Sequence, residues 1–248
     1  MDDSGPDGVI ENRRSDGYFY KMMSCHSKLL EKIFKANGFT ETHKERWSVC
    51  WGTGSLKPEV FQNLSFWQKV NHFPRLNELT RKDSMIRNLS KMSKKFGNQF
   101  NFVPKTYIMP QETLLLTRDH EKYRHTGKMY IVKPIGSSQG KGIYLTDSIS
   151  EIMNRSQNPT VVSHYIEDPL LINGYKFDLR IYVTITSIDP LRIYIYEEGI
   201  ARFATEPYTL NGDLLDNKYI HLTNFSINKH SENFFIDKEK ENVGNKWS

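Results

Sequence analysis

A glycine-rich segment, reading IVKPIGSSQGKGIYL over residues 131–145, carries the residue types that bind phosphate. Glycine reaches positive φ and lets backbone N–H groups approach an anion, while serine, glutamine and lysine side chains add donors. The spacing matches neither familiar phosphate loop. Only three residues separate Gly136 from Gly140 where a Walker A loop needs four, and Leu145 occupies the third glycine position of a dinucleotide fingerprint. We predict a mobile flap over nucleotide phosphates, with an ordinary glycine-rich hairpin as the alternative.

A second group of chemical interest lies on a predicted strand further along the chain. Residues 177–185 alternate apolar and polar side chains, which predicts a half-buried strand with Lys176, Asp178 and Arg180 on its polar face. On an isolated antiparallel strand, such residues could form a surface ladder of ion pairs. A charged turn at 198–203 and the sequence HLTN at 221–224 follow. With the flap, they could supply cations for phosphates and oxygen ligands for magnesium, so a nucleotide site is the sharper interpretation.

The net charge of +5 is unevenly placed along the chain. Residues 75–105 contain two acidic residues, Glu78 and Asp83. The basic residues of this range are more numerous: Arg75, Arg81, Lys82, Arg87, Lys91, Lys94, Lys95 and Lys105. Such a run is either a solvated helix face or a surface that attracts an acidic partner. Thr80 is expected to cap the helix here, which puts Lys82 in the first turn, where a cation is unfavourable. This cost suggests that Lys82 serves something other than helix stability.

The elements that must position these groups change in type along the chain. Residues 1–17 are polar and are expected to be disordered, residues 18–35 contain apolar side chains at helical spacing, and the aromatic residues of 47–73 are expected in a core. A further helix is predicted after Thr80, with Met85, Leu89, Met92 and Phe96 as its apolar stripe. Strands are predicted at 129–133, 160–166, 177–187 and 191–196, with a turn at 188–190 between the last two.

Composition excludes several classes of protein. No apolar run approaches the roughly 18 residues of a membrane span, and the N-terminal residues lack the apolar core of a signal peptide. Cys25 and Cys50 are too few for a disulfide framework and are not spaced for zinc, so a reducing compartment is expected. No RNA- or DNA-binding motif accompanies the basic charge. We therefore expect a globular cytosolic or cytoskeletal protein that binds neither membrane nor nucleic acid.

Five motifs in order resemble those of the tubulin–tyrosine ligase-like family. They are RKD at 81–83, KPIGSSQGKGI at 133–143, YIEDPLLINGYKFDLRIYV at 165–183, EGIARFATEPY at 198–208 and KYIHLTNFSINK at 218–229. QGKGI with TNFS is more similar to the glutamylating members. The resemblance covers residues 46–248 and implies an α+β fold of the ATP-grasp type, in which two lobes clamp ATP. Residues 1–45 would be a polar, partly disordered segment with a short helix.

The resemblance also implies roles for individual residues. Lys133 would bind the ATP phosphates, the lid would contain Gln139, Gly140, Lys141 and Gly142, and adenine would be framed by Ser163, His164, Tyr165 and Ile166. Other ATP contacts would come from Lys176, Phe177, Asp178, Thr223 and Asn224, and the incoming glutamate would be held by Arg202, Ser226 and Lys246. Arg180 and Lys82 would be catalytic, although Arg180 could instead form an ion pair with Asp178. A guanidinium is suited to clamping an acyl phosphate or tetrahedral intermediate.

The implied activity is ATP-dependent addition of glutamate to glutamate side chains of tubulin, with ATP and Mg²⁺ as cofactors. Expected partners are tubulin C-terminal tails, microtubules and free L-glutamate, for a monomer in the cytoplasm on the cytoskeleton, including the cilium or basal body. The family's magnesium ligands, an Asp and a later Glu-x-Asn, have no counterpart before Ser248. The ATP-grasp fold is therefore expected to be truncated and incomplete at the C-terminus, with no metal ligand in this chain. The alternative is an inactive module that binds microtubules or nucleotide.

Overall fold

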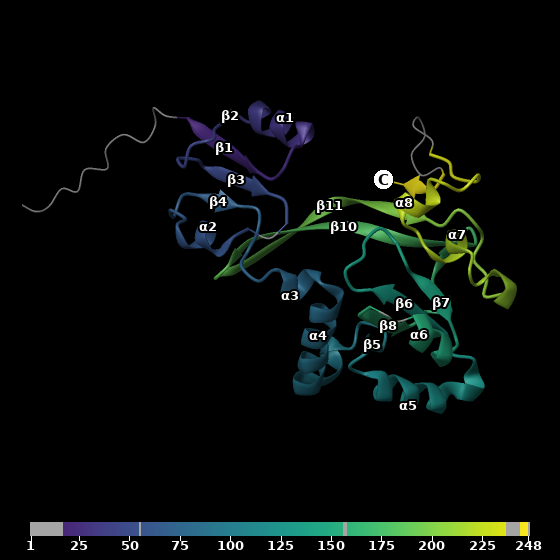
Figure 1. The fold of residues 1–248 in the computed structure, drawn as a ribbon. Coiled ribbons are helices and arrows are strands. Elements are labelled where there is room, and N and C mark those ends of the chain that lie inside the picture. Colours follow the sequence, from purple (N-terminus) through teal and green to yellow (C-terminus); the bar gives the residue numbers. More distant parts are fainter. Residues whose placement is uncertain (1–16, 55, 156–157, 237–243, 248) are drawn as a thin grey trace, which may run out of the picture. The chain divides into compact units, whose positions relative to one another are not determined.

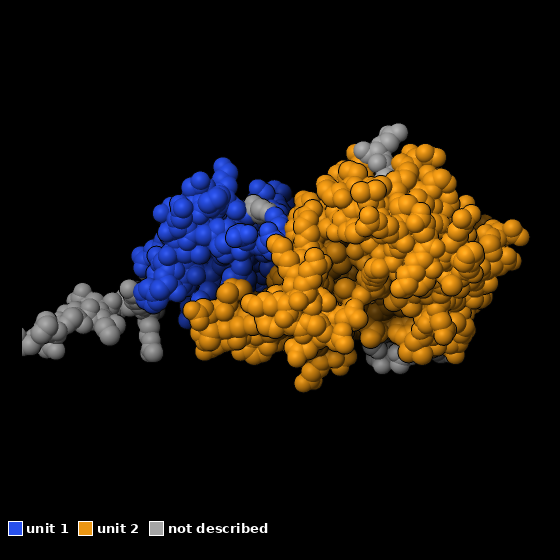
Figure 2. All heavy atoms as spheres, turned by 90° about the horizontal axis from the view of Figure 1, so that it is seen from below, with its two compact units in different colours: residues 1–78 blue, residues 79–248 orange. Residues whose placement is uncertain are grey.

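The computed structural model describes residues 17–54, 56–155, 158–236 and 244–247. The chain divides into two compact units, residues 1–78 and residues 79–248, which Figure 2 colours separately. Among the described residues, no helix combines the length and apolar character needed to cross a membrane.

The first unit is built on a parallel sheet of order β2-β1-β3-β4 (Figure 1). Its elements are β1 Tyr18–Met23, α1 Lys28–Ala36, β2 Phe39–Glu41, β3 Val49–Gly52, α2 Pro58–Gln62 and β4 Lys69–Val70. The Ser27 hydroxyl accepts from Leu30 N–H, so the helix begins at Lys28, and the first part of the predicted helical segment is β1 instead. The strands of this sheet extend from residue 18 to residue 70, so the domain boundary expected between residues 45 and 46 falls between two of its strands, β2 and β3.

The aromatic residues of this unit are only partly in its core. Tyr20 is fully buried and its ring stacks on Phe34 with centroids 4.7 Å apart. Trp47 is 6% exposed, as expected for a core residue, but Phe66 is 83% exposed. The core prediction was therefore right for Trp47 and wrong for Phe66. An aromatic residue type does not by itself determine whether the side chain points toward the sheet or toward solvent.

The second unit contains an antiparallel sheet of order β5-β8-β6-β7. Its strands are β5 Thr106–Met109, β6 Tyr130–Pro134, β7 Tyr144–Thr146 and β8 Thr160–His164. One face packs with α5 Thr113–Tyr123 and α6 Ile149–Arg155, through a core that includes Leu116, Tyr130 and Ile152 (Figure 1). The opposite face holds a second core of Met129, Ile131, Leu145, Tyr165 and Leu222. Along β6, Tyr130 and Ile131 thus enter different cores, as period-two alternation requires.

A long hairpin forms a second sheet of this unit, of order β12-β11-β10-β9. Its strands are β9 Leu171–Ile172, β10 Tyr175–Ile188, β11 Leu191–Phe203 and β12 Lys246–Trp247. The predicted turn at 188–190 is confirmed, but the charged turn predicted at 198–203 is wrong, since these residues continue β11. The prediction that the apolar side of this strand is buried is also wrong along the hairpin. Leu179, Ile181 and Val183 are each more than half exposed in the part of the chain that the structure describes.

The remaining helical elements are short except for α4. They are α3 Asn77–Thr80, α4 Lys82–Phe96, α7 Lys218–His221 and α8 Phe225–Asn228, with 3₁₀ turns at Gly97–Phe100, Arg124–Thr126 and Gly212–Leu214. Arg81, not Thr80, is the N-cap residue of α4. The buried Asp83 carboxylate accepts from the guanidinium of Arg81 and also pairs with Arg87 at 3.1 Å. Part of the basic run is therefore neutralised within the unit.

Candidate functional site

Three lysines from distant parts of the second unit lie close together: Lys82 at the start of α4, Lys133 in β6 and Lys176 in β10. Burial and the nearby charge of Lys82 lower the pKa of Lys133. Burial and the charge of Lys133 lower the pKa of Lys176 to about 8, against an opposing effect of Asp178. Partly buried cations that repel one another cost free energy, which a bound anion would offset. We call these three residues the lysine cluster.

The glycine-rich segment forms the loop between β6 and β7, as predicted, and it contacts this cluster. Lys82 Nζ donates to the carbonyl of Ser137 over 2.7 Å, and the Ser137 hydroxyl donates to the carbonyl of Lys141 over 2.9 Å. Gln139, Gly140 and Gly142 have positive φ values of 60°, 77° and 71°, and glycine, which adopts such values without strain, occupies two of these three positions. The loop thus has the backbone conformation that its glycines permit, while its role as a flap over phosphates stays a prediction.

The tip of the loop rests on the segment that starts α8. The Ser226 hydroxyl donates to the Gln139 carbonyl over 2.9 Å. A Cβ on Gly140 would lie 2.3 Å from Ile227 Cδ1 and 3.2 Å from Asn224 Oδ1. A side chain at this position would be strained by the positive φ and would have to displace Ile227, and the approach brings two predicted nucleotide-site residues, Gly140 and Asn224, side by side. Lys141 is exposed on the same loop.

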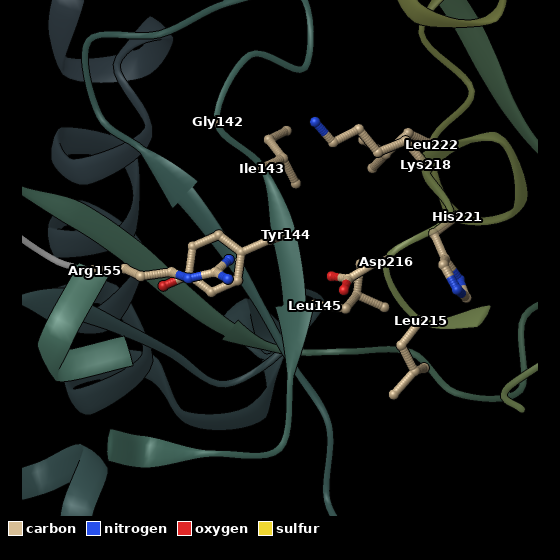
Figure 3. A pocket seen from close by; sticks show the side chains of 10 residues that line it. All are labelled: Gly142, Ile143, Tyr144, Leu145, Arg155, Leu215, Asp216, Lys218, His221 and Leu222. Carbon is tan, nitrogen blue, oxygen red and sulfur yellow. The ribbon is translucent and has the colours of Figure 1, made fainter. Parts of the chain in front are cut away.

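Beneath the loop, a buried tyrosine connects the lysine cluster to a histidine. Lys176 Nζ donates to the Tyr165 hydroxyl over 2.8 Å, and that hydroxyl lies 3.1 Å from His221 Nδ1. His221 lines a cavity of about 330 Å³ together with the end of the loop and residues 215–222 (Figure 3). The sequence motifs included His221 but gave it no role, and its position next to Thr223 and Asn224 was the available signal.

A second cavity, of about 670 Å³, brings together four of the predicted site residues: Arg180, Arg202, Thr223 and Lys246. Its apolar side includes Phe225 and Phe234, whose rings meet edge to face with centroids 5.7 Å apart. The cavity continues the polar face of β10, where Lys176, Asp178 and Arg180 succeed one another at every second residue. Lys176 of the lysine cluster therefore lies on the same strand face as Arg180 of this cavity.

The Arg202 guanidinium in this cavity is already bound by a carboxylate. Its Nε donates to Asp178 Oδ1 over 2.7 Å, and its Nη2 donates to Asp178 Oδ2. This two-point hydrogen bonding raises the pKa of Arg202 further above its ordinary range. It also leaves Asp178 paired with Arg202, and not with Arg180 as the sequence interpretation allowed. Arg180 and Lys246 contribute further positive charge to the same cavity.

Several predicted site residues direct their side chains elsewhere. His164 Nε2 lies 2.5 Å from Asp119 Oδ2 on the α5 face, and the Ser163 hydroxyl accepts from Thr106 over 2.9 Å. Since β8 is an interior strand, the backbone N–H groups of His164 and Tyr165 donate to the carbonyls of Lys105 and Met129. These donors are occupied in this structure. Of residues 163–166, Tyr165 is the one with a described side-chain contact to the lysine cluster.

Two other features of the predicted site can be placed. Phe177 lies on the apolar side of β10, where its ring centroid is 5.7 Å from that of Phe203. Within the described ranges, no group of three His, Cys, Asp or Glu side chains could hold a metal ion.

Comparison with known proteins identifies the family. A family model described as "Tubulin-tyrosine ligase family" matches residues 61–248. The chain belongs to this family. The resemblance drawn from the five motifs is thereby confirmed.

Relatives within the tubulin–tyrosine ligase family carry polyglutamylase names. "Tubulin polyglutamylase TTLL5" of Homo sapiens is 42% identical over 234 residues, which cover 92% of this chain and 18% of the relative. "Probable beta-tubulin polyglutamylase" of Tetrahymena thermophila is 42% identical over 224 residues, covering 88% and 18%. "Tubulin polyglutamylase ttll-5" of Caenorhabditis elegans is 37% identical over 244 residues, covering 92% and 33%. The chain thus spans a third or less of the length of these relatives.

Proposed function

We propose that this protein belongs to an ATP-dependent ligase that adds glutamate to glutamate side chains of tubulin. The observation that carries the proposal is the lysine cluster. Burial and the charge of Lys82 lower the pKa of Lys133, and burial and the charge of Lys133 lower the pKa of Lys176, while Asp178 opposes only the second shift. A polyphosphate is the ligand that such a site would bind most strongly. The polyglutamylase names of the relatives support tubulin as the substrate.

In this proposal the second unit is an ATP-grasp-like domain and the glycine-rich loop is its lid. Lys133 and Lys176 contact the phosphates, and Lys82 links the lid to α4 through the Ser137 carbonyl. Thr223 and Asn224 contact the ribose and phosphates, next to Gly140 of the lid. Magnesium is assigned no protein ligand, because the described residues contain no suitable group.

The proposed reaction has two steps. An oxygen of the acceptor γ-carboxylate attacks the γ-phosphorus of ATP, which forms an acyl phosphate and releases ADP. The α-amino group of free glutamate then attacks the acyl carbon, phosphate leaves, and the nitrogen loses a proton. Arg180 stabilises the anionic intermediate, while Arg202 and Lys246 hold carboxylates of the incoming glutamate in the cavity that they line.

In this proposal, the acidic tubulin tail binds the exposed C-terminal part of the basic stretch 75–105. Arg81 and Arg87 are paired with Asp83, whereas Lys91, Lys94 and Lys95 lie exposed on α4. Such surface charges accelerate association with an acidic chain, and salt weakens this effect. We place the protein in the cytoplasm on microtubules.

The direct test is transfer of radiolabelled glutamate to purified tubulin in the presence of ATP and Mg²⁺. Transfer that depends on ATP and is competed by glutamate, but not by glycine or tyrosine, supports the ligase. No transfer, combined with measurable ATP binding and microtubule co-sedimentation, would favour the alternative of an inactive binding module. Preferential use of glycine or tyrosine would overturn the choice of donor.

Replacement of Arg202 by lysine tests the donor cavity. Arg202→Lys keeps the positive charge but loses the two-point hydrogen bonding to Asp178 that fixes the guanidinium in the cavity. We therefore expect the KM for glutamate to rise about tenfold while ATP affinity stays nearly unchanged. Steady-state transfer kinetics measure the first quantity and calorimetry the second. Arg192→Lys, on the exposed part of the same strand, is the matched control. Unchanged glutamate kinetics in Arg202→Lys would contradict the assignment.

A further inference from the structure

The buried contact between Tyr165 and His221 joins residues that are 56 positions apart in sequence. Tyr165 is 4% and His221 is 2% exposed, and their rings meet edge to face at 5.8 Å. The Lys176 ammonium lies 4.5 Å from the centroid of the Tyr165 ring and donates to its hydroxyl. The proposed phosphate-binding lysine is thus held from one side by Tyr165, which in turn contacts His221.

The direction of these hydrogen bonds follows from which groups can accept. An ammonium has only donors, so the Tyr165 oxygen accepts from Lys176 and its own hydrogen needs another acceptor. His221 Nδ1, at 3.1 Å, offers that acceptor when the imidazole is neutral with its proton on Nε2. The neighbouring Tyr208 hydroxyl donates to the Glu167 carbonyl over 2.8 Å and is also a hydrogen-bond neighbour of Tyr165.

The surroundings of His221 favour the neutral ring. Burial and the positive charge of Lys176 lower the pKa of His221 to about 4. The ring is also held edge to face against Tyr208, with centroids 5.9 Å apart. Its buried Nε2 makes no hydrogen bond of good geometry with the described residues, and the Leu214 backbone near the ring only partly opposes the fall in pKa.

We propose that His221 is a positioning residue, which orients the Tyr165 hydroxyl so that its oxygen accepts from Lys176 and holds that ammonium in the lysine cluster. This positioning role does not itself require a nucleotide; only its expected effect on ATP binding rests on the proposed function. If ATP binds at the cluster, loss of the histidine acceptor lets the hydroxyl rotate, and the ammonium loses its fixed place beside Lys133. Asp178, the other charged group that acts on Lys176, would then compete for it.

The first measurement needs no nucleotide. In protein with ¹³C-labelled lysine Cε atoms, with the Lys176 signal assigned by its loss in Lys176→Arg, we expect titration near pH 8. In His221→Leu, which keeps similar volume but has no acceptor, the midpoint should fall, because the ammonium loses an ordered acceptor. His221→Asn, whose side-chain oxygen can take the place of Nδ1, should restore it. Tyr196→Phe, which removes the hydroxyl of a 64% exposed tyrosine on β11, is the control.

The second measurement is ATP affinity by calorimetry on the same variants. His221→Leu and Tyr165→Phe should each weaken binding about 2- to 10-fold, the range of one net hydrogen bond, and the double variant should be no weaker than either. His221→Asn should bind like the unmodified protein. Urea denaturation of each variant shows whether it is folded.

The two measurements separate two kinds of failure. If the unmodified protein does not bind ATP, the proposed function fails, while the lysine titration still decides the role of His221. If folded His221→Leu keeps the unmodified Lys176 midpoint, the positioning role is overturned. Equal shifts in His221→Leu and His221→Asn would overturn it as well, because they would show that histidine acts through its shape and not through its acceptor.

Discussion

The two faces of the β5-β8-β6-β7 sheet handle buried charge in opposite ways. On the α5 face, Asp119 is almost fully buried and accepts from Lys105 and His164. Burial by itself would raise the pKa of Asp119, but these hydrogen bonds outweigh it and lower the pKa below its ordinary value. On the opposite face, Lys133 and Lys176 are also partly buried, and burial together with repulsion by a neighbouring lysine (Lys82 for Lys133, Lys133 for Lys176) lowers the pKa of each.

The contrast separates a structural cluster from the binding site that we propose. The Asp119 carboxylate is neutralised by Lys105 and His164, and these contacts link α5 to the start of β5 and the end of β8. The lysine cluster has no comparable set of carboxylates among the described residues, and we propose that a bound anion supplies the missing negative charge. His164 and Tyr165 mark the division, since these neighbours in sequence enter the two different environments. Perturbed cations without neutralising partners are therefore the better guide to function here.

The largest effect is expected on the neutralised face. Asp119→Asn removes the carboxylate that pairs with Lys105 and His164, so we expect the free energy of unfolding to fall by about 2–3 kcal/mol, a value discounted because Lys105 is partly exposed. Urea denaturation at pH 7 measures it. The difference from the unmodified protein should narrow as the pH falls below the ordinary Asp range, where the depressed pKa no longer contributes stability. ATP affinity of the folded variant should not change, and a large loss would break the comparison.

The next effect concerns the lysine cluster and binding. Lys133→Ala should weaken ATP binding by about 1–3 kcal/mol, because a charge-assisted contact to phosphate is lost. Stability without nucleotide should stay the same or rise, since the lysine is not neutralised in the free protein. Calorimetry gives the affinity, and exposed Lys122→Ala on α5 is the control. Equal ATP affinity in Lys133→Ala and the unmodified protein would remove Lys133 from the site.

The smallest effect is a stability difference that depends on pH. The pKa of Lys176 is about 8 in the folded protein against an ordinary 10.5, so the unfolded chain binds more protons between these values and this lysine makes stability rise with pH. Lys176→Met should therefore stabilise the free protein at pH 7 by on the order of 1 kcal/mol, and the gain should disappear toward pH 10. Urea denaturation across this range tests it. A less stable Lys176→Met at pH 7 would mean that Lys176 is neutralised, as Asp119 is.

Some features of this molecule could be predicted from local sequence alone. Positive φ in the glycine-rich loop, the turn at 188–190 and the placement of Lys176, Asp178 and Arg180 on one strand face all depend on a few consecutive residues. Local rules failed where distant packing decided. Residues 198–203 were predicted as a turn, but they pair with β10. Among the described residues, the apolar side chains of Leu179, Ile181 and Val183 on the hairpin remain exposed.

The sequence by itself determined which chemical groups the protein possesses and the family to which it belongs, since motif order and spacing are properties of the chain. Only the tertiary structure decided which of these groups meet. Lys82 reaches Ser137 across 55 positions and Tyr165 reaches His221 across 56, and no periodicity extends over such separations. Alternation along β8 predicts that His164 and Tyr165 face opposite sides. It cannot predict that one side offers Asp119 and the other the lysine cluster, because packing between distant segments sets the charge around each residue.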